Sequence, residues 1–145
     1  MNRNYTTSIL VERSPDIVFN RINDVGQWWQ GEIKGSSHQQ GDEFTYEMKG
    51  FHFTRQLVTE LIPGKKVTWL VTESRINFVE QPDEWKNTRI VFDIAAEQNK
   101  TRLTFTHQGL LPSLECYGSC SNAWQKLIGS SLFSFIGSGK GVDVF

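Results

Sequence analysis

One stretch near the C-terminus, residues 113–137, restricts what this chain can fold into more than any other. Its apolar residues recur at the 3.6-residue period of a helix and share one side of it: Cys116, Tyr117, Cys120, Ala123, Trp124, Leu127, Ile128 and Phe135. Pro112 precedes the stretch, Ser113 can cap its first turn, and Glu115 stands where the helix dipole favours a negative charge. The sequence therefore predicts one long helix over residues 113–137, about 35 Å in length.

Most of the chain before this stretch alternates with period two, which is typical of half-buried strands. We expect strands over residues 5–12, 32–36, 42–49, 52–61, 67–72, 89–94 and 102–107. Ser14-Pro15-Asp16 begins a short helix after the first strand, and residues 25–31 form a second short helix or tight turn. A bulge is expected in the 52–61 strand, and residues 74–87 are expected to be a long hairpin connection.

This order of elements predicts an α+β fold with a single domain over residues 1–145. A curved antiparallel sheet of about six to seven strands would wrap around the long C-terminal helix, because no other element is large enough to cover the apolar face of the sheet. The net charge of −1 favours neither nucleic acid nor an anionic membrane as a partner. No apolar segment approaches a signal sequence or a membrane span, so we expect a cytoplasmic protein.

Aromatic residues make up 12% of the chain, with five Trp and ten Phe. Such rings either fill a thick core or line a pocket for an apolar guest, and composition alone favours the core. We take the aromatic residues of the sheet and helix as the candidate ligand-binding set, with His107 and Tyr117 as its polar groups and Cys120 beside them: Trp28, Trp29, Phe44, Tyr46, Phe53, Trp69, Phe78, Trp85, Phe92, Phe105 and Trp124.

Cys116 and Cys120 lie four residues apart on the expected helix, so their side chains point the same way and do not meet the geometry of a disulfide. They are expected to be buried thiols, and a three-ligand metal set with His107 is the alternative. No cofactor is expected. No catalytic residue is expected either, because no inward carboxylate pair and no nucleophile elbow is present.

Several short motifs occur in an order that resembles a known superfamily: residues 14–19, Trp28-Trp29, Gly41, residues 61–64 with Trp69, residues 101–107, Gly109 and residues 116–124. The chain resembles the helix-grip domains of the START and birch-pollen-allergen-like (SRPBCC) superfamily. Within it, the chain is similar to the C-terminal domain of activators of the ninety-kilodalton heat-shock chaperone's ATPase. The resemblance implies an inner cavity, which in relatives holds lipids, sterols, plant hormones or polyketide intermediates.

Three functions follow from these observations and the resemblance. The first is binding of a small hydrophobic ligand, lipid-like or aromatic, between the sheet and the C-terminal helix. The second is a chaperone-activator type of partner binding, and the third is an enzyme of the polyketide cyclase type, since an inward His and Tyr could move protons. Phe133 and Ile136 are expected on the outer side of the helix, where the C-terminal tail, a second copy or another partner would cover them.

Overall fold

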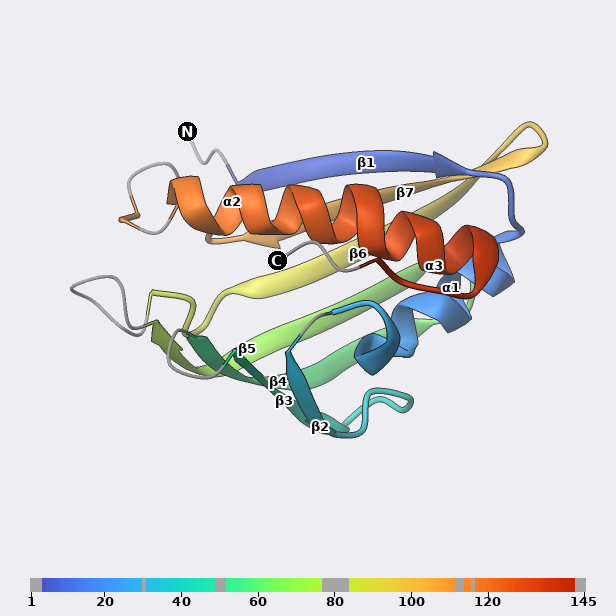
Figure 1. Cartoon of the computed structure of the whole chain (residues 1–145). Coiled ribbons are helices and arrows are strands. Elements are labelled where there is room, and N and C mark those ends of the chain that lie inside the picture. The colour runs from blue at the N-terminus through green and yellow to red at the C-terminus, as the bar shows by residue number, and fades with distance from the viewer. Residues whose placement is uncertain are drawn as a thin grey trace.

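A computed structural model describes residues 4–29, 31–48, 52–76, 84–111, 114–115 and 117–142. In chain order the elements are β1 (Tyr5–Val11), α1 (Pro15–Asn23), the 3₁₀ turn η1 (Val25–Gln27), β2 (Glu32–Gly35), β3 (Glu43–Met48), β4 (His52–Ile62), β5 (Lys66–Ile76), β6 (Arg89–Glu97), β7 (Lys100–Gln108), α2 (Tyr117–Lys126), the π-helical segment η2 (Leu127–Leu132) and α3 (Phe133–Ser138). The long helix made by α2, η2 and α3 lies across a single sheet, as Figure 1 shows. The predicted α+β helix-grip architecture is confirmed.

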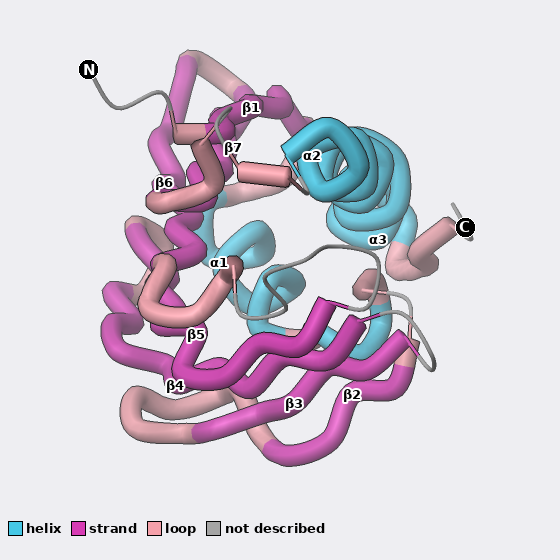
Figure 2. Tube along the Cα trace, turned by 90° about the vertical axis from the view of Figure 1, so that its left-hand side faces the viewer, coloured by secondary structure: helices cyan, strands magenta, loops and turns pink. Residues whose placement is uncertain are grey.

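All seven strands belong to one antiparallel sheet with the order β1-β7-β6-β5-β4-β3-β2. Neighbours from β2 to β7 follow one another in the chain, whereas β1 pairs with the last strand, so that Tyr5 lies opposite His107. The sheet curves around the long helix and α1 (Figure 2). Alternation along each strand sends one set of side chains to this concave inner face and the other set to the outer face.

The strands β4 and β5 are the longest in the sheet, with eleven residues each. Their pairing shifts register between Arg55 and Gln56 and again between Val58 and Glu60, which confirms the expected bulge. The expected connection over residues 74–87 is partly wrong, because β5 continues to Ile76. Ile76 is buried, so the apolar residue placed in the connection belongs to the sheet instead.

The first half of the C-terminal helix begins later than the sequence pattern indicates. Leu114 and Glu115 lie in a bend and a turn, and the helix starts at Tyr117. The backbone N–H of Glu115 donates to Glu84 Oε2 at 2.9 Å, which ties this residue to the turn at residues 84–87. Ser113, the expected cap, lies outside the described residues.

The second half of the helix differs in pitch. Residues 127–132 are π-helical, so each residue there turns the chain by less than the 100° of an α-helix. The buried residues consequently follow a spacing of four, as the pairs Leu127-Ile128, Ser131-Leu132 and Phe135-Ile136. The expectation that Ile136 faces outward is therefore wrong, because the wide turns bring it back to the core. Phe133 is exposed, as expected.

The two short segments after β1 close one end of the grip. The Ser14 side chain accepts a hydrogen bond from the N–H of Ile17 and Pro15 occupies the first turn of α1, as the sequence predicts. Trp28, which follows η1, is buried and donates from Nε1 to the carbonyl of Ile22 at 3.1 Å. Within the described residues, no helix combines the length and the apolar character needed to cross a membrane.

Candidate functional site

Aromatic residues gather between the inner face of the sheet and the facing side of the helix. Strands β3, β5, β6 and β7 contribute one or two rings each, η1 and the residues after it contribute two, the turn at residues 84–87 contributes one, and α2 contributes one. All of these side chains are buried: Phe44, Tyr46, Trp69, Phe92, Phe105, Trp28, Trp29, Trp85 and Trp124. The structure therefore brings together nine of the eleven aromatic residues in the predicted set.

Trp124 lies at the centre of these rings. Its ring centroid is 4.6 Å from that of Phe105, 5.0 Å from that of Trp29 and 5.6 Å from that of Trp85. Trp29 in turn stacks on Tyr46 at 4.4 Å. The rings thus contact one another directly, as they do in a well-packed core.

His107 is fully buried and is tied into a chain of hydrogen bonds. The Nε1–H group of Trp124 donates to His107 Nδ1 at 3.1 Å, and His107 Nε2 lies 2.8 Å from Thr88 Oγ1. The Thr88 hydroxyl also donates to the carbonyl of Trp85. Because Nδ1 accepts and the Thr88 proton is already used, the proton of the neutral imidazole belongs on Nε2.

Burial, with a smaller contribution from the charge of His52, lowers the pKa of His107 to about 3. The imidazole is therefore neutral at physiological pH, with both nitrogens bonded to protein groups. The residues that bond to His107 are Trp124 and Thr88, and not Tyr117, the other polar group of the predicted set. Tyr117 is half-buried at the start of α2 and packs against the edge of the core.

A second set of polar side chains lies on the inner face of β4, and the sequence analysis missed it. His52, Thr54 and Gln56 alternate with outward-facing residues, and Thr54 and Gln56 are completely buried. Gln56 Nε2 donates to Thr54 Oγ1 at 3.0 Å. The signal that could have found them is the apolar Val58, which has the same parity, because residues of the same parity share a face until a bulge intervenes.

His52 belongs to the aromatic region. Its ring centroid lies 4.4 Å from that of Trp85 and 5.7 Å from that of Tyr46. Burial lowers the pKa of His52 to about 4, so this imidazole is also neutral at physiological pH. Burial likewise raises the pKa of Tyr46 to about 12, although a hydrogen bond with Trp29 opposes the rise. The site is thus uncharged.

The remaining predicted site residues lie elsewhere. The ring of Phe53 packs under the guanidinium of Arg75 at 4.5 Å, on the outer side of β4, because its neighbours on the strand face inward. Phe78 and Cys116 lie outside the described residues. Cys120 is a buried free thiol, and no three His, Cys, Asp or Glu side chains come together as metal ligands in the part of the chain that is described.

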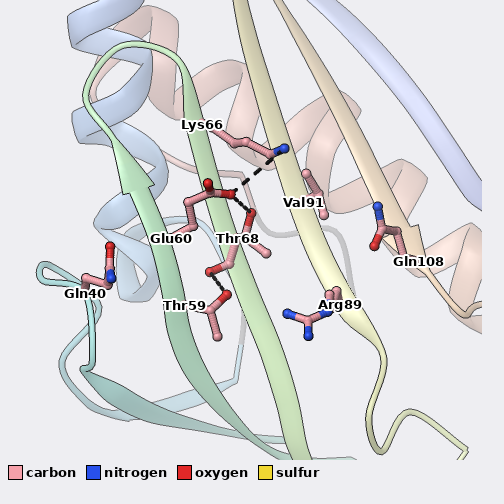
Figure 3. A pocket seen from close by; sticks show the side chains of 8 residues that line it. All are labelled: Gln40, Thr59, Glu60, Lys66, Thr68, Arg89, Val91 and Gln108. Atoms are coloured by element: carbon pink, nitrogen blue, oxygen red, sulfur yellow. Dashed lines mark hydrogen bonds and ion pairs between the residues drawn. The ribbon is translucent and has the colours of Figure 1, made fainter.

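The outer face of the sheet carries a hollow of quite different character (Figure 3). Its volume is about 400 Å³ and its lining is polar, with a single aliphatic residue: Gln40, Thr59, Glu60, Lys66, Thr68, Arg89, Val91 and Gln108. Glu60 accepts a hydrogen bond from Thr68 and pairs with Lys66, which also lies 3.9 Å from Asp93. Glu60 and Lys66 are therefore partnered within the protein.

The curved sheet, the long gripped helix and the buried aromatic face between them define a START-like, SRPBCC-type domain. The chain belongs to the family described as Activator of Hsp90 ATPase homolog 1-like protein, whose model matches residues 15–136. Family and fold together support a ligand-binding domain.

Solved structures agree with this assignment. The chain is 25% identical to the Aha1 dimer from Colwellia psychrerythraea, with a TM-score of 0.76 over 96% of this chain and 99% of that chain. SSP2350 from Staphylococcus saprophyticus shares the fold at 13% identity, with a TM-score of 0.72 over 99% and 98% of the two chains. DynU16, a protein in the dynemicin biosynthetic locus, shares it at 14% identity and a TM-score of 0.69, over 97% of this chain and 49% of its own. A search of curated proteins gives no match.

Proposed function

We propose that the protein binds a small, largely hydrophobic molecule between the inner face of the sheet and the C-terminal helix. The family and the fold support this function, and so does the aromatic lining. The observation that carries the proposal is the position of Trp85. Its ring comes from a four-residue turn, yet it fills the space between His52 on β4, His107 on β7 and Trp124 on α2.

A side chain on a turn can move without breaking a strand or a helix. The turn at residues 84–87 is held by its backbone, because the N–H of Asn87 donates to the carbonyl of Val71 and the carbonyl of Trp85 accepts from Thr88. The indole Nε1 of Trp85 has no hydrogen-bond partner among the described residues. Displacing this ring therefore costs no hydrogen bond, and an apolar guest could replace its ring contacts.

Titration with the uncharged fluorescent probe N-phenylnaphthylamine tests the proposal. We expect saturable binding to the wild type and tighter binding to Trp85→Ala, in which the ring that occupies the site is gone. Phe53→Ala serves as the matched control, since it removes a ring from the outer face, and its affinity should equal that of the wild type. Absence of saturable binding in both the wild type and Trp85→Ala would overturn the proposal.

A second candidate function is self-association, and one surface favours it. Leu10, at 37% exposure, and Phe133, at 45%, line a groove of about 410 Å³ between the end of β1 and α3. The guanidinium of Arg13 bonds to the carbonyl of Gly137 and joins the two elements there. The Aha1 relative is a dimer over nearly the same length of chain, so we propose a second copy of this chain as the occupant of the groove.

Sedimentation of the wild type and of Phe133→Ser distinguishes the outcomes. We expect a dimer for the wild type and a monomer for Phe133→Ser, while Leu57→Ser on β4 should leave the dimer intact. A wild type that stays monomeric at high concentration would refute the dimer. Binding of an Hsp90-type chaperone that is lost in Phe133→Ser would assign the groove to that partner instead.

A further inference from the structure

Five buried polar side-chain atoms have no hydrogen-bond partner among the described residues: Oδ1 of Asn23 on α1, and four atoms of the strands β4 and β5 and the turn at residues 84–87. These four are the amide oxygen of Gln56, the indole nitrogens of Trp69 and Trp85, and Nε2 of His52. Gln56 and Trp69 are completely buried, and Trp85 is exposed by only 3%. Buried polar atoms in native proteins nearly always find a partner, so these four require an explanation.

The four atoms belong to one region of the inner face. Gln56 pairs in register with Val71 of β5, and Trp69 is two residues earlier on that same strand, with its ring also on the inner side. His52 lies one bulge away from Gln56 on β4 and contacts the ring of Trp85 at 4.4 Å. Sheet and turn therefore place these atoms on the inner side of the sheet, which faces the helix.

The hydrogen-bonding character of this set is mixed. Both indoles can only donate, the Gln56 amide offers its unpaired oxygen as an acceptor, and the neutral imidazole of His52 can take either role. If the Gln56 amide is turned over, an N–H group is left unpaired in place of the oxygen, and the set is still incomplete. Such a set matches a small group that both donates and accepts, such as a hydroxyl.

A charged ligand group would find no counter-ion here. The buried polar residues of the described chain are Asn, Ser, Thr, Gln and His, with no Asp, Glu, Lys or Arg among them. Burying an ionised group without an opposite charge is far more costly than burying a neutral polar group that is hydrogen-bonded. The low pKa values of both histidines are consistent with such a medium.

We propose that the ligand is an uncharged aromatic or alicyclic molecule with a hydroxyl or carbonyl group, and that this group hydrogen-bonds to Gln56 and to the indole of Trp69. This inference rests on the proposed function, because it names the ligand class and the polar anchor of the same site. The inference adds two requirements to hydrophobic binding. The polar group of the ligand must be neutral, and removing the protein's polar side chain must weaken the binding only of ligands that have such a group.

Three probes of the same shape test the inference: naphthol, naphthalene and naphthoate, each competing with N-phenylnaphthylamine at neutral pH. We expect naphthol to bind the wild type about tenfold more tightly than naphthalene, the gain from a hydrogen bond worth about 1.4 kcal/mol. Naphthoate should be the weakest of the three. Gln56→Leu should reduce naphthol affinity about tenfold and leave naphthalene affinity unchanged, which also shows that the variant is folded. Gln108→Leu, an exposed glutamine on the outer face of β7, is the matched control.

The outcomes separate the two proposals. If naphthol and naphthalene bind equally well, or if Gln56→Leu leaves naphthol affinity unchanged, hydrophobic binding stands and the polar anchor is refuted, with the buried atoms then satisfied by water. Naphthoate binding most tightly would overturn the choice of an uncharged ligand. If no probe displaces N-phenylnaphthylamine because that probe does not bind either, the proposed function itself fails.

Discussion

Acid should destabilise this protein before its carboxylates titrate, because the buried His107 and the partly buried His52 are both neutral in the folded state. An ordinary histidine in the unfolded chain binds a proton near pH 6.5, whereas burial lowers the pKa in the folded chain to about 4 for His52 and about 3 for His107. The unfolded state therefore binds more protons than the folded state between pH 6.5 and about 4. Stability is complete above this window and falls as the pH drops through it.

The size of the effect follows from linkage. Between pH 7.5 and 5.5 each unfolded histidine changes from about 10% to about 90% protonated, while its folded counterpart stays neutral. Each residue should then cost about 1.4 kcal/mol of unfolding free energy, and the two together about 2.7 kcal/mol. Asp and Glu contribute little over this interval because most of them titrate below it.

Urea unfolding followed by Trp fluorescence at pH 7.5, 6.5 and 5.5 measures this directly. His52→Gln and His107→Gln should each lose about half of the pH dependence, whatever their stability at neutral pH, because only the difference between pH values is compared. A wild type whose stability changes by less than about 0.7 kcal/mol would refute the neutral, desolvated state of the two imidazoles.

Three further predictions concern the stability of the fold. Trp124→Ala should lower the free energy of unfolding by about 3–5 kcal/mol, because it removes the ring at the centre of the core together with the hydrogen-bond donor to His107. A decrease of less than about 1 kcal/mol, measured by urea denaturation, would contradict this. Gly109→Ala should lower the free energy of unfolding by about 1–3 kcal/mol, because Gly109 has φ +100° and an added Cβ would lie 2.6 Å from Thr88 Cγ2. Gly118→Ala is the control: there is open space around Gly118, so this variant should be as stable as the wild type or more stable in the same assay. EDTA and a reducing agent should leave the melting temperature unchanged, since Cys120 is a free buried thiol, and a drop with chelator would point to a metal site.

The architecture could be predicted because it depends on periodicity and on local signals. The period-two strands, the Ser14 cap with Pro15 and the 3.6-residue pattern through Cys120 and Trp124 are all properties of neighbouring residues, and each has a direct structural cause. The bulge in β4 was expected because Val58 breaks the parity of its neighbours. These features specify a sheet that needs one long helix to cover it.

The phase of the helix beyond Leu127 was misjudged because the period itself changes there. An extrapolated 3.6-residue repeat turns Ile136 to the outside, whereas the π-helical segment keeps it over the sheet. The spacing of four among Leu127, Ser131 and Phe135 was visible in the sequence. The local sequence, however, does not distinguish such a spacing from a wide apolar stripe on an ordinary α-helix. Packing against the sheet therefore decides whether this segment is α-helical or π-helical.

The partners of the site residues could not be predicted for a different reason. His107 was placed on the inner face by its parity with Phe105, but its hydrogen bonds join three segments that are distant in sequence: β7, α2 and the residue that precedes β6. The orientation of His52 depends on the bulges between β4 and β5, which the pattern of one strand does not specify. Which polar atoms are satisfied is a property of the assembled fold, not of any one strand.

The hydrogen bonds and pKa values of His107 and His52 indicate whether either side chain could act as a general base. His107 has both nitrogens engaged by Trp124 and Thr88, so it could accept a proton only by giving up the Trp124 hydrogen bond. His52 has a buried Nε2 with no partner in the described structure, but with a pKa of about 4 it is a weak base at neutral pH. Neither imidazole is tuned toward the operating pH as a general base would be. The uncharged surroundings that depress both pKa values are the same surroundings that favour a neutral ligand, so the arrangement supports binding over proton transfer.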